Sequence, residues 1–567
     1  MNQRPPFGRE EAPSLLVFVC GIGQSFAYRF DKKWLRRGAF PKGTLRDYEN
    51  HAPLIEEGAY TDTWNLFARN MGEQFRSPAG AALLAKAAAA LAGSLIARKN
   101  LLGEKTAARL VRRAFRANIP AQNGGGDPKV VTPRYATPLS EYPGVTKEEG
   151  RFHSHAKYRF YRNIPCADIA QSVMGEGFED YLYCFNYPPC SYTSENVEAL
   201  RRFLDTALEN NRVGAKTAVL IPMSMGASVV SAYLARYPDP AVNHVRRVVS
   251  IVGCWRGSAV MEDLIKRRFR VDPVRELRKA AEANKKNRAL RFALACCSDR
   301  MLSGLFDSLL SAFVREVILG SPSLAALVPD TVYPEIRELI RNPEVRKETD
   351  AYHAAQVSVP ERLRTLREQG VETFFIAGYG LGLGSVTPDY DALSYLQNAD
   401  RVNSDEIIEI SSTAPGAVAA PPGQKLPRTE RELLSPDGGV SLGTALFPEN
   451  TWLFYRQKHE LEYNNVAVTL ALRLALGQIG SVRDCADPAK PELYYPQFNF
   501  ARNNKTLVTE LLPKLDAWLK NGGRLSEEQT RLVEDVKAAM RSNAVDPEAE
   551  AALNARFARM VERLQNA

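Results

Sequence analysis

The hydrophobic pattern of the chain alternates between short apolar runs and amphipathic stretches. Residues 14–20, SLLVFVC, form a continuous apolar run that ends at a glycine turn, which is typical of a buried strand. Between 180 and 252 the pattern predicts strand, helix, strand, helix and strand, and strand signals return at 371–380 and 451–457. This alternation predicts an α/β fold, in which a parallel sheet carries crossover helices on both faces.

Long segments without strand signals separate these core elements. Residues 26–150 have the pattern of an insertion, and 256–365 are helical and charged, as expected of a lid or cap over the sheet. Beyond Lys505 helix and turn signals alternate. The expected divisions are the core, residues 1–255 and 366–504, the helical lid, 256–365, and the helical C-terminal extension, 505–567.

An alanine-rich helix is predicted at 78–97, within the first insertion. Its length is that of a membrane span. Its internal lysine, Lys86, and the dominance of alanine favour a closely packed buried helix instead. Leu84, Leu91 and Leu95 would form the packed face.

A second helix of the insertion, within 101–118, is amphipathic and basic. Leu102, Leu110 and Phe115 recur at helical spacing among five lysines and arginines. An ordinary solvated face is the simpler interpretation of such a helix. Peripheral contact with an anionic membrane surface is the alternative.

Composition narrows the class of protein. Of 567 residues, 45% are hydrophobic and 25% charged, which are the proportions of a globular chain. The net charge of +9 favours anionic partners, but no zinc-finger spacing or glycine-rich nucleotide loop accompanies it, so nucleic acid is not an expected partner. The first 13 residues are charged and proline-containing where a signal peptide needs an apolar core, so a cytoplasmic location is expected.

Cysteine and histidine usage gives no sign of a metal site. The eight cysteines lack paired metal-binding spacing and are expected to be reduced and buried, with Cys184 and Cys190 as the pair that an oxidising compartment would allow to bridge. His153 and His155 are the only local histidine pair and lack a third ligand. We therefore expect no metal and no cofactor.

The strongest chemical signal is a serine between a strand and a helix. The run 217–221, TAVLI, leads into Pro222, Met223, Ser224, Met225 and Gly226, and then into an apolar helix. A serine at such a tight turn presents its hydroxyl near a helix amino terminus, where backbone N–H groups stabilise developing negative charge. Gly226 suits the crowded turn, whereas Pro222 replaces the usual glycine.

A serine nucleophile needs a histidine as its base. Where the nucleophile lies on an elbow of this kind, the chain order is serine, acid, histidine, which leaves three candidates after position 224. His244 lies before a strand, at the edge of the sheet opposite the serine turn. His353 lies in the predicted helical lid, 256–365. His459 follows the last predicted strand, and we therefore choose it as the base.

The imidazole in turn needs a carboxylate to fix its tautomer. The candidates between the 371–380 strand and His459 include Asp389, Asp391, Asp405 and Asp437. Asp437 stands in a glycine-flanked turn able to aim an acid inward, so it is the predicted third member. For the oxyanion, the predicted donors are the N–H groups of Met225 and Ile22, with Gly23 as the next candidate.

Four segments together resemble a known superfamily. They are VFVCGIGQS (17–25), PMSMG (222–226), SPDGGVSLGTA (435–445) and KHELEYNN (458–465). The sequence is similar to α/β-hydrolases, and within them to lecithin:cholesterol acyltransferase-like and inositol-deacylase-like lipid enzymes. PMSMG resembles the Pro-His-Ser-Met-Gly elbow of the phospholipid:diacylglycerol acyltransferase relatives, with Met223 in place of histidine.

The expected activity is therefore serine-dependent hydrolysis of a carboxylic ester through an acyl-serine intermediate. The resemblance implies a lipid ester, as for a lipase or phospholipase. The basic residues of the helical lid, 256–365, would then contact an anionic lipid surface. Three alternatives remain open: acyl transfer to an alcohol, a delivered antibacterial phospholipase, and a binding protein that keeps the sheet without turnover.

Overall fold

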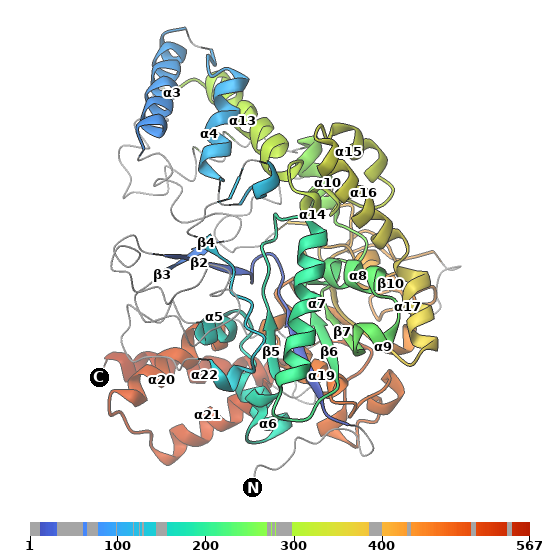
Figure 1. Ribbon diagram of the computed structural model, residues 1–567. Helices are drawn as coiled ribbons and strands as arrows, with labels where there is room; N and C mark the ends of the chain where they lie inside the picture. The colour runs from blue at the N-terminus through green and yellow to red at the C-terminus, as the bar shows by residue number, and fades with distance from the viewer. Residues whose placement is uncertain are drawn as a thin grey trace.

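A seven-stranded parallel sheet forms the centre of the protein, and helices cover both of its faces (Figure 1). The prediction of an α/β fold with a parallel sheet is confirmed at this level. The computed structural model describes residues 12–30, 60–64, 77–97, 99–116, 118–123, 125–126, 130–142, 156–268, 274, 278, 297–384, 398, 400–427, 433–500, 506–540 and 547–566.

The strand order places the first strand inside the sheet. From one edge to the other, the strands are β12 (Phe498–Asn499), β11 (Thr451–Tyr455), β8 (Glu372–Tyr379), β7 (Val245–Ile251), β6 (Thr217–Pro222), β1 (Ser14–Val19) and β5 (Leu182–Phe185). Every neighbouring pair is parallel, so all the strands end at the same edge. Two small antiparallel sheets are formed by β2 (Phe26–Phe30), β3 (Tyr60–Trp64) and β4 (Val130–Val131), and by β9 (Val418–Ala419) and β10 (Val440–Ser441).

Both faces of the sheet are buried, which explains the unbroken apolar run of the first strand. Leu15, Val17 and Val19 belong to one core, whereas Leu16 and Phe18 belong to the other. The first core is closed by α7 (Thr193–Asn210), α8 (Gly226–Arg236), α16 (Pro343–Val357) and α17 (Val359–Glu368). The second is closed by α5 (Ala156–Asn163), α6 (Ala167–Met174) and α19 (Asn465–Ala475).

The segment predicted as one lid, 256–365, is divided between two parts of the molecule. Its last helices, α16 and α17, pack on α8 and β8 and belong to the layer that covers the sheet. Its middle helix, α13 (Asp299–Phe313), packs instead against the first insertion. The remaining described elements of the segment are α10 (Ala259–Lys266), the π-helix η7 (Val314–Ile318), α14 (Pro322–Ala325) and α15 (Tyr333–Leu339).

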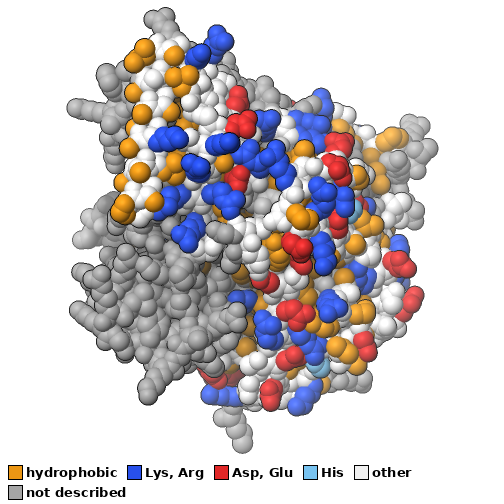
Figure 2. All heavy atoms as spheres, turned by 45° about the horizontal axis from the view of Figure 1, so that its top comes forward, with side chains coloured by type: hydrophobic (Ala, Val, Ile, Leu, Met, Phe, Trp, Pro, Cys, Tyr) orange, Lys and Arg blue, Asp and Glu red, His pale blue; other side chains and the backbone are white. Residues whose placement is uncertain are grey.

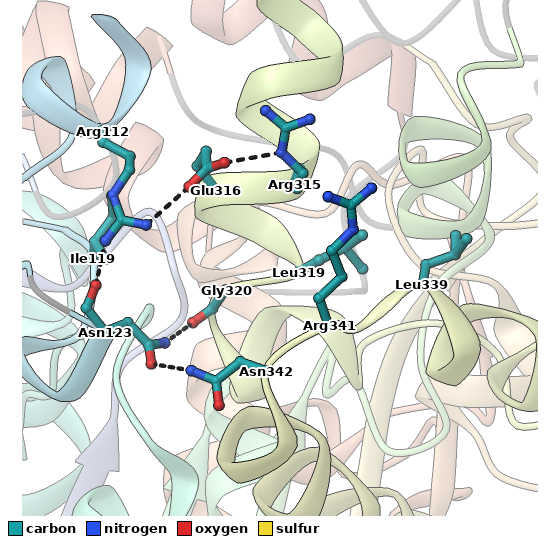
Figure 3. A pocket seen from close by; sticks show the side chains of 10 residues that line it. All are labelled: Arg112, Ile119, Asn123, Arg315, Glu316, Leu319, Gly320, Leu339, Arg341 and Asn342. Atoms are coloured by element: carbon teal, nitrogen blue, oxygen red, sulfur yellow. Dashed lines mark hydrogen bonds and ion pairs between the residues drawn. The ribbon is translucent and has the colours of Figure 1, made fainter. Parts of the chain in front are cut away.

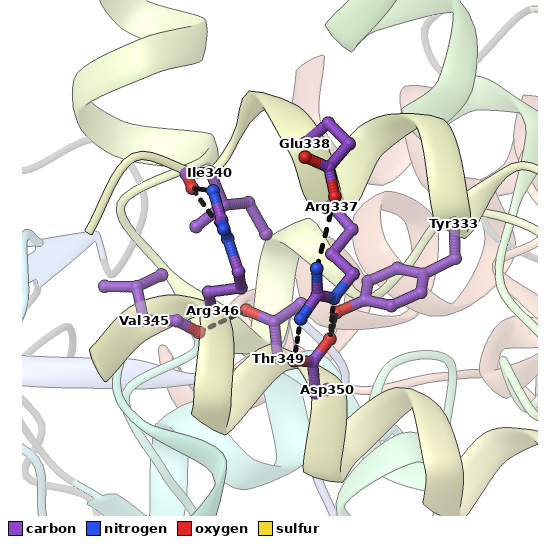
Figure 4. Close-up of polar contacts among 8 residues, drawn as sticks. All are labelled: Tyr333, Arg337, Glu338, Ile340, Val345, Arg346, Thr349 and Asp350. Carbon is purple, nitrogen blue, oxygen red and sulfur yellow. Dashed lines mark hydrogen bonds and ion pairs between the residues drawn. The ribbon is translucent and has the colours of Figure 1, made fainter. Parts of the chain in front are cut away.

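A polar contact joins α15 to α16 (Figure 4). The carboxylate of Asp350 accepts a hydrogen bond from the Tyr333 hydroxyl at 2.7 Å and two from the Arg337 guanidinium at 2.8 and 3.0 Å. The hydrogen bonds from Arg337 lower the pKa of Asp350, although burial opposes this. Arg346 donates to the carbonyl oxygen of Ile340, at the end of α15. These basic side chains of the predicted lid, 256–365, are therefore bound to other groups of the protein.

Three helices form a projection on one side of the core, here called the helical projection: α3 (Pro78–Ala97), α4 (Glu104–Ala114) and α13 (Figure 1). They share a small apolar core that includes Ala107 and Val111. The amide of Asn100 donates to the Gly304 carbonyl and to the Ser308 hydroxyl, both at 2.8 Å. The two predicted insertions thus pack together.

The prediction of a closely packed buried helix at 78–97 is wrong. The helix has the predicted bounds, but Leu84 is 46% exposed and Ile96 is 87% exposed. Its contacts are made along one narrow line that includes Ala87 and Ser94. Among the described residues, none of the helices combines the length and apolar character that crossing a membrane requires.

The C-terminal helices have a core of their own. They are α20 (Leu512–Lys520), α21 (Glu527–Ala539) and α22 (Pro547–Asn566). Val536 and Phe557 lie at the centre of this core, and an ion pair of 3.0 Å between Lys537 and Asp168 connects it to α6. Short helical turns complete the chain: α9 (Pro240–Asn243), α18 (Ile410–Thr413), η3 (Ala121–Asn123), η4 (Leu139–Glu141), η6 (Phe178–Asp180), η10 (Pro448–Asn450), η11 (Leu461–Tyr463), η12 (Val482–Cys485), η13 (Pro491–Leu493) and η14 (Leu507–Leu511).

The described cysteines are free thiols. Cys184 and Cys190 are both buried and are not bonded to each other. The nearest sulfur to Cys184 is that of Cys20, at 3.6 Å, between adjacent strands of the sheet. Cys296 lies outside the described residues.

Candidate active site

Four loops that follow strands of the sheet meet at its carboxyl edge. They come after β1, β6, β8 and β11, and they carry Gly21 to Gln24, Ser224, Asp405 and His459 respectively. Because all the strands are parallel, their carboxyl ends lie side by side, which is where parallel sheets place their ligand sites. The loops bring together residues from positions 21 to 459 of the chain.

Ser224 occupies a strained turn between β6 and α8. Its φ of +51° lies in the left-handed region, which is costly for a residue other than glycine. The backbone of this turn packs tightly on β1, since a Cβ at Gly226 would lie 2.3 Å from the Val19 carbonyl oxygen. Pro222, the exception in the predicted elbow, is the last residue of β6, opposite Val19. The predicted strand, tight turn and helix around Ser224 are all present.

His459 is the histidine that contacts Ser224. Its Nε2 lies 2.8 Å from the Ser224 hydroxyl oxygen. The other two candidates lie elsewhere: His353 stacks on the ring of Tyr333, and His244 precedes β7, with its Nε2 3.8 Å from an Asp205 oxygen. The structure therefore brings together the predicted serine and histidine.

The carboxylate on His459 is that of Asp405, and the prediction of Asp437 in this position is wrong. Asp405 Oδ2 lies 2.8 Å from His459 Nδ1. Asp405 Oδ1 accepts the backbone N–H groups of Ile407 and Ile408 at 3.0 and 2.8 Å, and the side chain is fully buried. The carboxylate is thus held in place from both sides.

Asp437 is engaged within its own turn, next to β10. It accepts a hydrogen bond from the Ser435 hydroxyl at 2.6 Å and one from the Gly439 N–H at 3.1 Å. This is the structural role of a turn aspartate. Asp405 was among the sequence candidates, and its one local signal is the Asp-Glu-Ile-Ile order, in which a turn aspartate precedes buried apolar residues. Asp389 and Asp391 lie outside the described residues.

Two opposing effects set the basicity of His459. Burial lowers its pKa, because it disfavours the charged ring. The carboxylate of Asp405 raises the pKa through its charge and its hydrogen bond, and Glu462 and Glu460 add to this. The net result is a pKa above the ordinary value of 6.5. The imidazole is therefore a stronger base than a histidine in water.

Backbone N–H groups near Ser224 are free to bind a ligand. Among the described residues, those of Ile22, Gly23 and Met225 donate no hydrogen bond. The loop approaches the serine closely, since a Cβ at Gly21 would lie 2.9 Å from Ser224 Cβ. The predicted oxyanion donors therefore lie on the two backbone segments that flank Ser224, and they are available to a ligand.

A buried pair of side chains, not foreseen from the sequence, holds this loop. Gln24 Oε1 accepts the N–H of Gly21 at 2.8 Å, and Gln24 Nε2 donates to Glu462 Oε1 at 3.0 Å. Glu462 follows His459 by three residues, so the contact joins the loop after β1 to the loop that carries the histidine. Burial raises the pKa of Glu462 to about 7.

Among the described residues, no group of three or more His, Cys, Asp or Glu side chains is placed to hold a metal ion. The pair His153 and His155, and also His51, lie outside the described part of the chain.

A scan against protein-family models finds no match to the chain, and a search of curated proteins finds none either.

The first prediction concerns the titration of His459. Exchange Asp405→Asn removes the negative charge at Nδ1, so the pKa of His459 should fall, whereas Asp437→Asn should leave it unchanged. NMR titration of selectively labelled histidines measures this, and His459→Gln identifies the signal. A shift caused by Asp437→Asn and not by Asp405→Asn would contradict the observed pairing.

The second prediction concerns the pH dependence of stability. The pKa of Glu462 is about 7 in the folded protein and 4.5 in the unfolded chain, so its contribution to stability is fully present below pH 4.5 and is lost as the pH rises through 7. Glu462→Gln should therefore raise the Tm at pH 8 and change it little at pH 4.5. The shift in pKa sets an upper limit of about 3 kcal/mol.

Glu460→Gln is the matched control, because it removes the same charge two residues away. Glu409, whose pKa burial also raises to about 7, titrates identically in all three proteins and cancels in the comparison. Thermal unfolding followed by circular dichroism at the two pH values gives the result. Equal effects of Glu462→Gln at both pH values would show that Glu462 does not titrate in this range.

Proposed function

We propose that the protein is a serine hydrolase of the α/β-hydrolase type, which cleaves carboxylic esters through an acyl-serine intermediate. The observation that carries this proposal is the continuous chain of hydrogen bonds from Asp405 through His459 to Ser224, at 2.8 Å each. A serine, a histidine and a buried carboxylate in this arrangement are recognised by their geometry and roles, whatever the order in the sequence.

The first half of the reaction follows from these contacts. His459 Nε2 takes the proton of the Ser224 hydroxyl as its oxygen attacks the ester carbonyl carbon. The carbonyl oxygen becomes an oxyanion, which the free N–H groups of Met225 and of Ile22 or Gly23 stabilise. The bond to the leaving alcohol then breaks, and His459 gives its proton to that alcohol. Ser224 is left acylated.

In the second half His459 removes a proton from water, and the water oxygen attacks the carbonyl carbon of the acyl-serine. The bond to the Ser224 oxygen then breaks, His459 returns the proton to that oxygen, and the acid is released. The carboxylate of Asp405 keeps the proton of His459 on Nδ1 and stabilises the charged ring in both halves. Transfer to an alcohol instead of water uses the same intermediate, and the products distinguish the two reactions. The lipid nature of the ester rests on the resemblance of the segments around Ser224 and His459 to lipid enzymes.

Two structural features favour chemistry over a role in binding alone. The strain at Ser224, with its φ of +51°, is a cost that a binding protein has no reason to keep. Free N–H groups on both flanking segments are likewise an arrangement suited to a developing charge.

The third prediction tests the nucleophile. A fluorophosphonate should form a single adduct on Ser224, detected by peptide mass spectrometry. Ser224→Ala should abolish this adduct and lower ester hydrolysis by about 10³-fold or more, and Ser194→Ala, at an exposed serine, should change neither. A panel of short esters, triglycerides and phospholipids identifies the substrate class. Normal hydrolysis by Ser224→Ala would overturn the proposal.

The fourth prediction tests Gln24 as a positioning residue. Gln24→Ala removes the acceptor for the Gly21 N–H and the link to Glu462, so the oxyanion loop loses its support. We expect kcat to fall about 10- to 100-fold with little change in KM, because the loop would stabilise the transition state more than the substrate. Gln369→Ala, an exposed glutamine at the end of α17, is the control. A change confined to KM would assign Gln24 to substrate binding instead.

A further inference from the structure

A groove between α3 and α4 gathers positive charge on the helical projection. It has a volume of about 520 Å³, and Ala79, Ala82 and Leu83 form its apolar part. Its other lining residues are Lys86, Arg109, Arg112, Arg113 and Arg116. Figure 2 shows Lys and Arg side chains gathered beside a row of hydrophobic side chains at the upper left of that view, on the side where Figure 1 draws the helical projection. The lining of the groove includes no acidic residue.

Much of this charge is uncompensated within the protein. Among the described residues, Lys86, Arg109 and Arg116 form no ion pair. The basic residues at the start of the predicted lid behave differently, since Arg256 pairs with Asp330 and Lys266 with Glu262. Three cations that lie close together and form no ion pair within the described part of the protein favour an anionic partner from outside.

The basic surface continues beyond the groove into a neighbouring pocket of about 230 Å³ (Figure 3). Arg112 lines both, and Arg315 and Arg341 join it in the pocket. Glu316 is the acidic residue there, and it is already engaged by Arg112 at 3.0 Å and by Arg315 at 2.9 Å. Arg341 is exposed and has no ion pair among the described residues. Arg315 also lies 3.8 Å from Glu104, and with both of these glutamates counted the groove and the pocket still carry more basic than acidic side chains.

Apolar side chains of α3, and one just beyond its end, are exposed to solvent. Ile96 is 87% exposed, Leu84 46% and Leu101 44%. All three lie on α3 or immediately after it, and Leu84 follows Leu83 of the groove. Lys86 is the one charged residue in the 20 residues of α3. A helix so poor in charge, open to solvent beside a row of arginines, combines the two properties that hold peripheral helices at membrane surfaces.

We propose that the helical projection docks on an anionic phospholipid bilayer. The basic groove would meet the lipid phosphates, and the apolar side chains of α3 would enter the boundary between headgroups and acyl chains. Nucleic acid would bind the arginines but would leave Ile96 and Leu84 exposed to solvent. These exposed apolar side chains therefore favour lipid over a soluble polyanion. The inference stands apart from the chemistry at Ser224.

Vesicle flotation tests the proposal on the full chain. The Ser224→Ala background is used throughout, so that no lipid is cleaved. We expect binding to vesicles of phosphatidylcholine mixed with phosphatidylglycerol, and little to phosphatidylcholine alone. Each basic residue at the surface contributes about fivefold, so the triple exchange Lys86→Gln, Arg109→Gln and Arg116→Gln should weaken partitioning about 100-fold. Higher salt should weaken the binding of the unexchanged protein.

Two sets of variants make the result specific. The triple exchange Lys216→Gln, Arg483→Gln and Lys514→Gln removes the same charge from exposed positions elsewhere and should leave binding within a few-fold. Leu84→Ser with Ile96→Ser should weaken vesicle binding without changing binding to heparin. Unfolding curves check that each variant folds.

Three outcomes would overturn the proposal. They are equal binding to neutral and anionic vesicles, full binding by the triple variant of the groove, and tight binding to heparin or RNA without binding to vesicles. The last would reassign the surface to a soluble polyanion. Because no result depends on ester hydrolysis, failure here and failure of the proposed reaction remain separate.

Discussion

The site depends on close contact between backbones, which three glycines allow. At Gly21, Gly226 and Gly378 an added Cβ would approach its neighbours within 2.9, 2.3 and 2.4 Å respectively. Gly226 lets the serine turn lie against β1, and Gly21 lets the oxyanion loop lie against Ser224. Gly378, in β8, leaves room for the backbone of the histidine loop at Gln457 and for Asp405. The 2.8 Å hydrogen bonds of the site form only because these segments pack so closely.

The parts of the site that the sequence predicted are those whose signal is local. Ser224 is marked by an apolar strand, a glycine and an apolar helix within about twenty residues, and His459 by its place after the last strand. The choice of Asp437 failed because a glycine-flanked turn shows that an aspartate is in a turn, without showing what faces the turn. Asp405 is 54 residues from His459. Their pairing depends on how the loop after β8 folds back over the sheet.

The same limit applies to the fold. The strands were predictable because burial on both faces leaves unbroken apolar runs, as in 14–20. Helical periodicity gave the bounds of α3 correctly and its environment wrongly, because a pattern shows which face is apolar and not whether anything covers it. The helical and charged pattern of residues 256–365 predicted a single lid. The structure instead uses α16 to cover the sheet and α13 to build the helical projection.

The packing of α4 on α13 also constrains the order of folding. The amide of Asn100 finds its partners at Gly304 and Ser308, about 200 residues further along the chain. During synthesis the first insertion leaves the ribosome long before α13 is made. Its apolar side chains therefore stay exposed to solvent while β5, β6 and β7 are synthesised. Contacts this distant in sequence form slowly, since a large loop must close first. The helical projection is accordingly a late element of assembly, and apolar surface that stays exposed for this long during synthesis is the kind that chaperones protect.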